Sequence, residues 1–230
     1  MNLMNNLAER FGLNAYALGK YELAETWFRR LEKTEGESNR VLRNLGVILM
    51  ARGNLAGAAE YLRREEELYG ENLQRHRALA DLHYASLDRE EAQRRYAAAI
   101  DERDTADLPD SERNFMKARV AICADPARFA HSRESADCFA AAERSREADG
   151  DAALELFIKA GELDPTNWPA FNNAGVLLLA KADGTERALE MFTRAAECVH
   201  LPTIETNLES ARAALCAARK AEKGPSGRHA

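Results

Sequence analysis

Residues 5–38 read NNLAERFGLNAYALGKYELAETWFRRLEKTEGES, and residues 39–72 read NRVLRNLGVILMARGNLAGAAEYLRREEELYGEN. When the two stretches are placed one above the other, their glycines, alanines and large apolar residues match at one constant interval. The matching pairs are Gly12 and Gly46, Gly19 and Gly53, Ala24 and Ala58, Phe11 and Leu45, and Phe28 and Leu62. A constant interval of about 34 residues predicts an array of stacked helix–turn–helix units.

Each stretch carries apolar residues at helical spacing, with a glycine between the two halves. In the first stretch Gly19 provides the turn, and both helices are expected to pack inward. The expected inward residues are Ala8, Phe11, Gly12 and Ala15 in the first helix, and Leu23, Ala24, Trp27, Phe28 and Leu31 in the second. Gly12 and Ala24 are small where two antiparallel helices cross, because a close-packed interior leaves no room there for larger side chains.

The pattern continues less regularly and then returns. Residues 73–103 fit a third unit loosely, with Leu79, Ala80, Ala92 and Tyr96, and with one residue fewer between its helices. Residues 133–167 and 168–201 again show the pattern. A closing helix is expected at 203–222 and a frayed tail at 223–230.

These motifs resemble the tetratricopeptide repeat (TPR) family. The family's Ala, aromatic, Ala and Pro are met at Ala153, Phe157, Ala160 and Pro165. The departures are that Leu31 and Glu65 stand where alanine is usual, and that Gly36 and Gly70 replace the proline. The resemblance covers most of residues 1–222. It implies an all-α fold, an α-α superhelix built as a TPR solenoid of antiparallel helix pairs.

The middle of the chain, residues 104–132, does not follow the period. A helix is expected from Asp110 to Ala124, followed by Asp125-Pro126, and another helix from about Arg133 to Ala148. Either Pro126 to His131 forms a short degenerate partner helix, or the array breaks here into two sub-stacks.

Composition and charge narrow the classes of function. The net charge of −6 and the pI near 5.5 argue against a general binder of nucleic acid or of an acidic membrane. The most apolar run, Ala174 to Ala180, is too short to span a membrane. The four cysteines show no spacing typical of a zinc site or a disulfide framework, so a reducing compartment, the cytoplasm, is expected.

No chemistry-bearing motif stands out. The chain has no GxGxxG, GxSxG, GKS/GKT or HExxH motif, so we expect neither an enzyme nor a cofactor. His76 and His83 lie two helical turns apart, whereas a metal site on a helix needs ligands one turn apart, so no metal is expected. The acidic residues between Asp101 and Asp110 lack the glycine and the final glutamate of a calcium loop.

In TPR proteins the first helices of successive units line the concave face and bind an extended peptide. By resemblance, the partner-binding residues here are Arg40, Arg43, Asn44 and Val47 in the second unit, Gln74, Arg77, Asp81 and Tyr84 in the third, and Asn172 and Asn173 in the last. Arginine and asparagine can pair the carboxylates and backbone of a peptide. In the set that grips the C-terminal carboxylate of heat-shock chaperones, Asn44 fits, but Glu9, Leu13, Gln74 and Ala78 do not, so that clamp is not expected.

The sequence therefore predicts a protein–protein interaction adaptor whose concave face holds a peptide or helix of another protein. The alternative is a structural self-assembly module, in which apolar ends or the irregular middle form homo-oligomers. The identity of the partner does not follow from the residues.

Overall fold

The computed structural model describes residues 3–222, which form twelve α-helices and one short 3-10 helix, with no strand among them. The α-helices are α1 (Leu3–Ala17), α2 (Tyr21–Glu35), α3 (Asn39–Ala51), α4 (Leu55–Tyr69), α5 (Leu73–Ala85), α6 (Arg89–Asp101), α7 (Asp110–Ala124), α8 (Pro126–Ser145), α9 (Gly150–Leu163), α10 (Trp168–Leu179), α11 (Thr185–Ala196) and α12 (Pro202–Glu222), and the 3-10 helix is η1 (Arg103–Asp107). The expected all-α fold is confirmed. The predicted tail, 223–230, lies outside the described residues.

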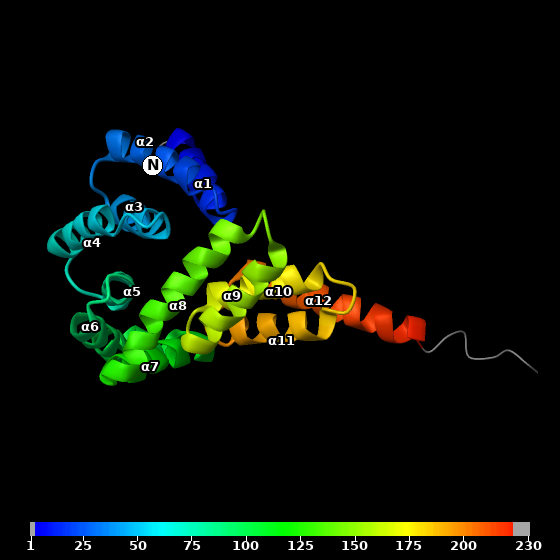
Figure 1. Cartoon of the computed structure of the whole chain (residues 1–230). Helices are drawn as coiled ribbons and strands as arrows, with labels where there is room; N and C mark the ends of the chain where they lie inside the picture. The colour runs from blue at the N-terminus through cyan, green and yellow to red at the C-terminus, as the bar shows by residue number, and fades with distance from the viewer. Residues whose placement is uncertain (1–2, 223–230) are drawn as a thin grey trace, which may run out of the picture. The chain divides into compact units, whose positions relative to one another are not determined.

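The chain divides into two compact units, one ending at Ala106 and the other beginning at Asp107. Unit 1 contains three antiparallel helix pairs, α1/α2, α3/α4 and α5/α6, and each second helix also packs against the first helix of the next pair. Within unit 1, α1, α3 and α5 lie on the inner side of a curved stack, and α2, α4 and α6 lie on the outer side (Figure 1). This is the TPR-solenoid arrangement that the period predicts.

The three pairs of unit 1 keep one register. The helices α3 and α5 begin at Asn39 and Leu73, which are separated by the same interval as Gly12 and Gly46. The link between the two helices of a pair has the same length at 52–54 and at 86–88, so the expectation of one residue fewer in the third pair is wrong. Gly19 and Gly53 turn the chain with φ of 71° and 77°, and Leu87 takes the same backbone conformation at φ 62°. The third repeat looked loose because a leucine stands in the glycine position.

Glycines mark the places where the two helices of a pair touch. A Cβ on Gly46 would lie 2.6 Å from Leu62, and one on Gly175 would lie 2.6 Å from Phe192. Both distances are shorter than any real carbon contact, so no larger residue fits without movement. The role predicted for Gly12 is also confirmed, since its Cβ would lie 2.7 Å from the Phe28 ring.

Side-chain caps fix where many of the helices begin. Asn54, Asn72 and Asp88 accept hydrogen bonds from backbone N–H groups three residues ahead, at the starts of α4, α5 and α6. Each cap satisfies a donor that the first helical turn leaves unpaired. Asp149 and Asn167 do the same for α9 and α10.

Unit 2 contains the pairs α8/α9 and α10/α11, with α12 packed on α11 and α7 packed on α8. The helix expected at Arg133–Ala148 begins earlier, at Pro126, so Pro126 to His131 is the start of α8 and not a separate partner helix. Proline suits this position because the first helical turn needs no N–H, and Asp125 caps it through Ala127 and Arg128. Whether residues 1–222 act as one continuous array stays a prediction.

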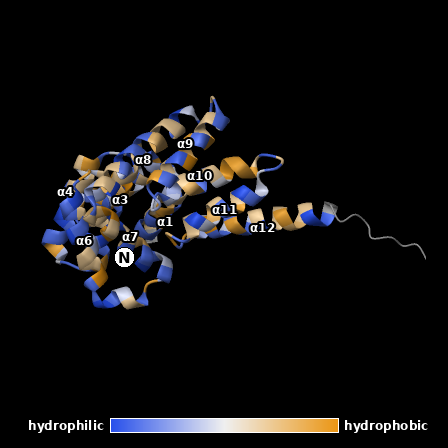
Figure 2. Cartoon of the chain, turned by 60° about the horizontal axis from the view of Figure 1, so that its bottom comes forward, coloured by the Kyte–Doolittle hydropathy of each residue, from blue (hydrophilic) through white to orange (hydrophobic). Residues whose placement is uncertain are grey.

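Each of the described α-helices carries both apolar and polar residues, and the mixed colours of the labelled helices in Figure 2 show this alternation. Across residues 3–222, none combines the length and the apolar character that crossing a membrane would need. Two residues of the expected inward stripes do not pack inward: Phe11 and Leu23 are 51% and 47% exposed. The periodicity placed them on apolar faces, and Phe11 does contact Trp27 of α2, but about half of each side chain stays exposed.

Candidate protein-interaction surface

The candidate inner face of unit 1 is defined by residues that recur at the same register on α1, α3 and α5. Four rows of three residues cross this face. They are Asn6, Arg40 and Gln74; Glu9, Arg43 and Arg77; Leu13, Val47 and Asp81; and Tyr16, Met50 and Tyr84. The first two rows are polar and the last two are largely apolar, so the face has a polar half and an apolar half.

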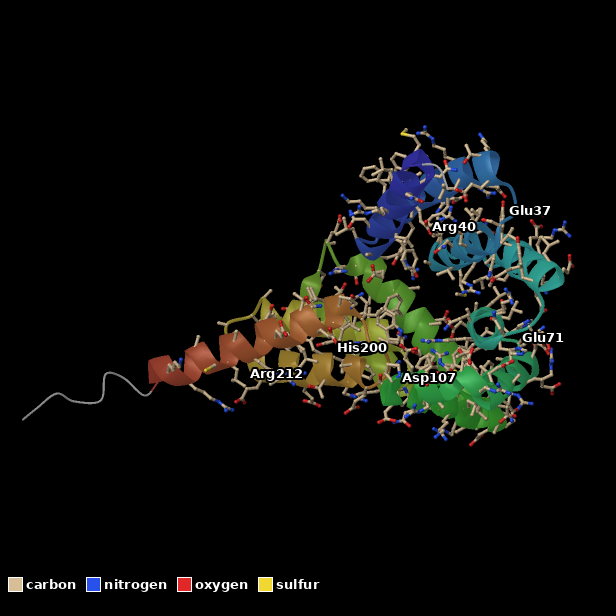
Figure 3. The ribbon with its side chains drawn as sticks, turned by 180° about the vertical axis from the view of Figure 1, so that it is seen from behind. Glu37, Arg40, Glu71, Asp107, His200 and Arg212 are labelled. Atoms are coloured by element: carbon tan, nitrogen blue, oxygen red, sulfur yellow. The ribbon has the colours of Figure 1, made fainter. Side chains whose placement is uncertain are left out.

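Arg40 is held in the polar half by two carboxylates. Its guanidinium ion-pairs with Glu9 of α1 and donates a hydrogen bond to Glu35 at the end of α2, at 2.6 Å. This hydrogen bond lowers the pKa of Glu35 below its ordinary value. Asn44 donates to the backbone carbonyl of Arg40 at 2.7 Å. Figure 3 shows Arg40 on the first turn of α3, next to Glu37 in the turn that precedes it.

Arg43 is anchored more deeply. Its Nε and Nη2 atoms donate to Glu65 Oε1 at 3.0 Å and 2.8 Å, and Glu65 is fully buried in α4. The same oxygen accepts from Nε of the buried Arg75 at 3.1 Å. Arg43 is itself half-buried, so the carboxylate fixes the guanidinium at the edge of the inner face. The sequence did not predict this ion pair, because its members are distant in the sequence and lie on different helices.

The apolar half contains Leu13, Val47 and Met50, and it ends at Asp81. Leu13 is exposed, whereas Val47 and Met50 are half-buried. Burial, followed by the nearby Tyr21 hydroxyl and the Asp81 carboxylate, raises the pKa of Tyr16 to about 12. The Tyr16 hydroxyl is thus protonated at physiological pH, as an unshifted tyrosine would also be.

The remaining predicted residues of the third pair differ in exposure. Asp81 accepts a hydrogen bond from the Tyr96 hydroxyl, and Tyr84 is buried with its ring 6.4 Å from that of Tyr96. Tyr84 thus contributes to packing and little to the surface. Gln74 is exposed and Arg77 is half-buried.

In unit 2 the predicted Asn172 and Asn173 belong to a chain of side-chain hydrogen bonds. Asn207 of α12 donates to Asn172 Oδ1 at 2.9 Å, Asn172 donates to Asn173 Oδ1 at 3.4 Å, and Asn173 donates to Glu143 of α8 at 2.8 Å. The chain joins α8, α10 and α12, the helices that alternate with α9 and α11. Sequence reasoning missed Asn207 and Glu143. The signal that could have found Asn207 is its distance from Asn172 in the sequence, which is close to one repeat period.

One cluster has the composition of a metal site. Ligand atoms of Glu66, Glu71 and His76 lie within 4.8 Å of one another. Arg95, however, already brings a cation there: its Nη2 donates to Glu66 at 3.0 Å, and its Nη1 lies 3.5 Å from His76 Nδ1 and 3.8 Å from Glu71. A metal ion would have to displace this guanidinium, so the cluster fits an ion-pair network better than a metal centre.

No family model matches the chain, and no curated protein is significantly similar to it. Among solved structures it is similar to MamA (41-end) from Desulfovibrio magneticus RS-1, at 16% identity and a TM-score of 0.45, covering 86% of this chain and 96% of that one. It is similar to YrrB, described as a TPR protein with an unusual peptide-binding site, at 17% identity and a TM-score of 0.41, covering 88% and 90%.

A further similar structure is the TPR2AB domain of yeast Sti1, described as a pHSP90 complex, at 13% identity and a TM-score of 0.44, covering 92% of this chain and 84% of that one. The assignment of the fold rests on the regularly repeating helix pairs of the chain itself.

Proposed function

We propose that the protein is an interaction scaffold, and that the inner face of unit 1 binds an extended peptide or a helix of another protein. The observation that carries this proposal is the alignment of the four rows on α1, α3 and α5. The rows bring a polar half and an apolar half side by side on one face of a rigid helix stack. A peptide with acidic and apolar residues on opposite edges would match both halves.

The polar half supplies charge-assisted donors. A guanidinium has five N–H donors, and Glu9, Glu35 and Glu65 use only part of those of Arg40 and Arg43. With Arg77, Asn44 and Gln74 they can reach the carboxylates and backbone carbonyls of a ligand. Because their carboxylate partners already hold Arg40 and Arg43, ordering these side chains costs little entropy on binding.

The apolar half supplies the anchor. Leu13, Val47 and Met50 present aliphatic and thioether surface that a ligand side chain can bury. Asp81 closes this half with a negative charge, which favours a basic or hydroxyl group at that end of the ligand. The direction of a bound peptide would follow from this asymmetry.

The asparagine chain of unit 2 is a second surface of the same kind. Amide side chains such as Asn172 and Asn173 can exchange their mutual hydrogen bonds for bonds to a peptide backbone. We propose that the two units act as separate binding surfaces of one non-enzymatic adaptor working in the cytoplasm. The four cysteines, all of them free thiols, support a reducing compartment.

A selection experiment tests the first surface. The full chain is immobilised, a displayed library of random peptides is selected on it, and the affinity of an enriched peptide is measured by calorimetric titration. We expect enriched peptides to combine acidic and apolar residues. Arg77→Ala and Val47→Asp should each weaken the binding about tenfold.

Two variants of α4 serve as matched controls. Arg63 and Ala56 are both exposed on this outer helix, and Arg63→Ala and Ala56→Asp should leave the affinity unchanged. Equal effects of the inner-face and outer-face substitutions would disprove the inner-face site.

Self-association is the second candidate function, because unit 1 exposes large apolar side chains such as Phe11 and Leu18. Light scattering over a range of protein concentrations distinguishes the two functions. A molar mass that rises with concentration would favour self-assembly, and a constant monomer mass would exclude it.

A further inference from the structure

The first pair of unit 1 presents an apolar face that none of the other described helices of this unit covers. We call it the N-terminal end face, and it consists of Leu7 and Phe11 of α1, Leu18 in the turn that follows α1, and Leu23, Trp27 and Arg30 of α2. Leu18 is 61% exposed and Phe11 is 51% exposed. The rings of Phe11 and Trp27 lie 5.2 Å apart, so the apolar surface continues from one helix to the other.

Comparison of α1 with α3 and α5 at the repeat interval shows which helix covers the equivalent face in the other two pairs. Leu7, Phe11 and Asn14 of α1 correspond to Val41, Leu45 and Ile48 of α3. These three residues of α3 are buried and belong to one cluster with Ala24, Phe28 and Leu31 of α2. On α5 the corresponding Leu79 and Leu82 are buried as well, and α4 packs on that helix. The position is therefore built to receive an amphipathic helix whose apolar residues recur every three to four positions.

In the second and third pairs, the covering helix (α2 or α4) also places glutamates against the pair that it covers. Tyr61, which corresponds to Trp27, donates to Glu32 of α2 at 2.8 Å. Arg64, which corresponds to Arg30, donates to Glu37 just after α2 at 2.9 Å. In the third pair Arg95 occupies the position of Tyr61, and it donates to Glu66 of α4, the counterpart of Glu32, at 3.0 Å. Figure 3 labels Glu37 and Glu71, which hold equivalent places after α2 and α4.

From this recurrence we infer that the N-terminal end face docks an acidic amphipathic helix of another protein, placed on α1 as α2 is placed on α3. The helix buries Leu7, Phe11 and Leu18 under its apolar stripe, and a carboxylate at its end reaches Arg30. The guanidinium of Arg30 is exposed, 6.0 Å from the ring of Trp27, and can accept this partner.

Charge favours such a helix over a second copy of the same face. Arg10 beside Phe11 and Arg30 beside Trp27 are both exposed and positive. If two copies joined through this face, like charges would gather at its edge, which opposes association. An acidic helix places opposite charges there. The site is distinct from the inner face, so the two proposals can fail independently.

The probe is a peptide with the sequence of residues 55–71, LAGAAEYLRREEELYGE, held helical by a staple on its solvent side. This segment covers α5 in the native protein, carries five glutamates against two arginines, and contains no tryptophan. The chain has two tryptophans, Trp27 and Trp168. In full-length protein with Trp168→Phe, the emission of Trp27 therefore reports on the end face alone.

We expect a saturable blue shift of the Trp27 emission as the peptide covers the ring. Leu18→Glu and Phe11→Glu should each weaken binding about tenfold or more. Leu18→Glu changes a mostly exposed side chain, so the result does not depend on whether Phe11→Glu disturbs folding. Leu68→Glu, a similarly exposed leucine on α4, is the matched control and should leave the affinity unchanged.

A charge swap tests the orientation. Arg30→Glu should weaken binding of the peptide, and replacing the last glutamate of the peptide by lysine should restore it.

The inference would be overturned if no saturable shift occurred, if a scrambled peptide bound equally well, or if Leu18→Glu and Leu68→Glu had the same effect. It would also be overturned if light scattering showed a dimer that Leu18→Glu abolishes, because a second copy would then occupy the face. Leu18→Glu should not change the affinity of a peptide selected on the inner face, which separates this result from the proposed function.

Discussion

Arg75 Nε lies 3.1 Å from Glu65 Oε1, and both side chains are buried, with 4% and 0% of their surfaces exposed. Arg75 also donates to the backbone carbonyls of Tyr69 and Gly70, at 3.1 Å and 2.7 Å. The pair therefore ties the start of α5 to the end of α4 and, through Arg43, to α3. Removing one partner of a buried pair leaves an uncompensated charge.

Glu65→Ala should destabilise the protein by about 3 kcal/mol, because Arg75 would remain buried without its carboxylate. Glu65→Gln keeps the volume and an acceptor oxygen, so its cost should be smaller, about 1–2 kcal/mol. Urea unfolding followed by circular dichroism gives both values. Glu67→Ala is the control, since this exposed residue pairs with Arg64 at the surface and should change stability by less than about 0.5 kcal/mol. Equal costs for Glu65→Ala and Glu67→Ala would contradict the prediction.

Gly46→Ala should destabilise unit 1 although alanine is the better helix former. Its Cβ would lie 2.6 Å from Leu62, so α3 and α4 would have to separate, at a cost of about 1–3 kcal/mol. Gly150→Ala is the matched control, because a Cβ on Gly150 meets no atom within 4 Å. That change at the start of α9 should be neutral or stabilising. A neutral Gly46→Ala in thermal unfolding would show that the two helices are less closely packed than described.

Leu87 should tolerate replacement by glycine better than other leucines do. Its φ of 62° costs a residue with a Cβ about 1–2 kcal/mol, and glycine lacks this cost. Leu87→Gly should therefore be neutral or stabilising by up to about 1 kcal/mol. Leu68→Gly, in the helix α4, should instead cost about 1 kcal/mol. The difference between the two changes in melting temperature is the test, and a loss for Leu87→Gly as large as that for Leu68→Gly would show that the side-chain contacts of Leu87 outweigh the strain.

The constant interval between repeats predicted the helices of unit 1 because each pair repeats the same glycines, caps and apolar positions. It did not predict that α8 begins at Pro126, because the helix was expected to begin only near Arg133. Proline is in fact compatible with a first helical turn, and Asp125 caps that turn. Periodicity also could not show that Phe11 and Leu23 are exposed, because it identifies an apolar face without telling whether another helix covers it.

The helix positions of the candidate site residues were predictable to a similar degree. The register placed Arg40, Arg43, Asp81 and the other row residues on the first helices, which is where they lie. It could not show that Arg43 is bound to Glu65, because the contact joins helices whose distance depends on tertiary packing. Which of the row residues bind a partner stays a prediction.

Stability in acid should depend on Glu91. Hydrogen bonds from Arg94 at 2.7 Å and from Arg95 at 3.1 Å lower the pKa of Glu91 from 4.5 to about 2. Because the folded pKa is below the unfolded one, the contribution to stability is present above pH 4.5 and is lost as the pH falls toward 2. Glu91→Gln should therefore flatten the dependence of the melting temperature on pH in this window and lower it near neutrality. Glu90→Gln, at an 86% exposed neighbour, is the control; parallel pH profiles for the two variants would contradict the assignment.

Thiol reactivity provides a further test of the described packing. Cys216 is exposed on α12, whereas Cys123, Cys138 and Cys198 are buried. Burial raises the pKa of the Cys198 thiol to about 11, so it is protonated as well as inaccessible at neutral pH. The thiolate is the reactive form. Iodoacetamide under native conditions should therefore label one cysteine per chain, identified as Cys216 by mass spectrometry.

The control for this labelling is Cys216→Ser, which should remove the rapid native reaction while leaving three thiols reactive in urea. Cys198 packs between helices, with its Sγ 3.4 Å from the Pro165 carbonyl, so it can react only when α11 separates from the end of α9. Its labelling rate should then follow the global unfolding equilibrium measured in urea. Rapid labelling of Cys198 in the native protein would mean that the pairs of unit 2 open locally, contrary to the close packing of α9, α10 and α11.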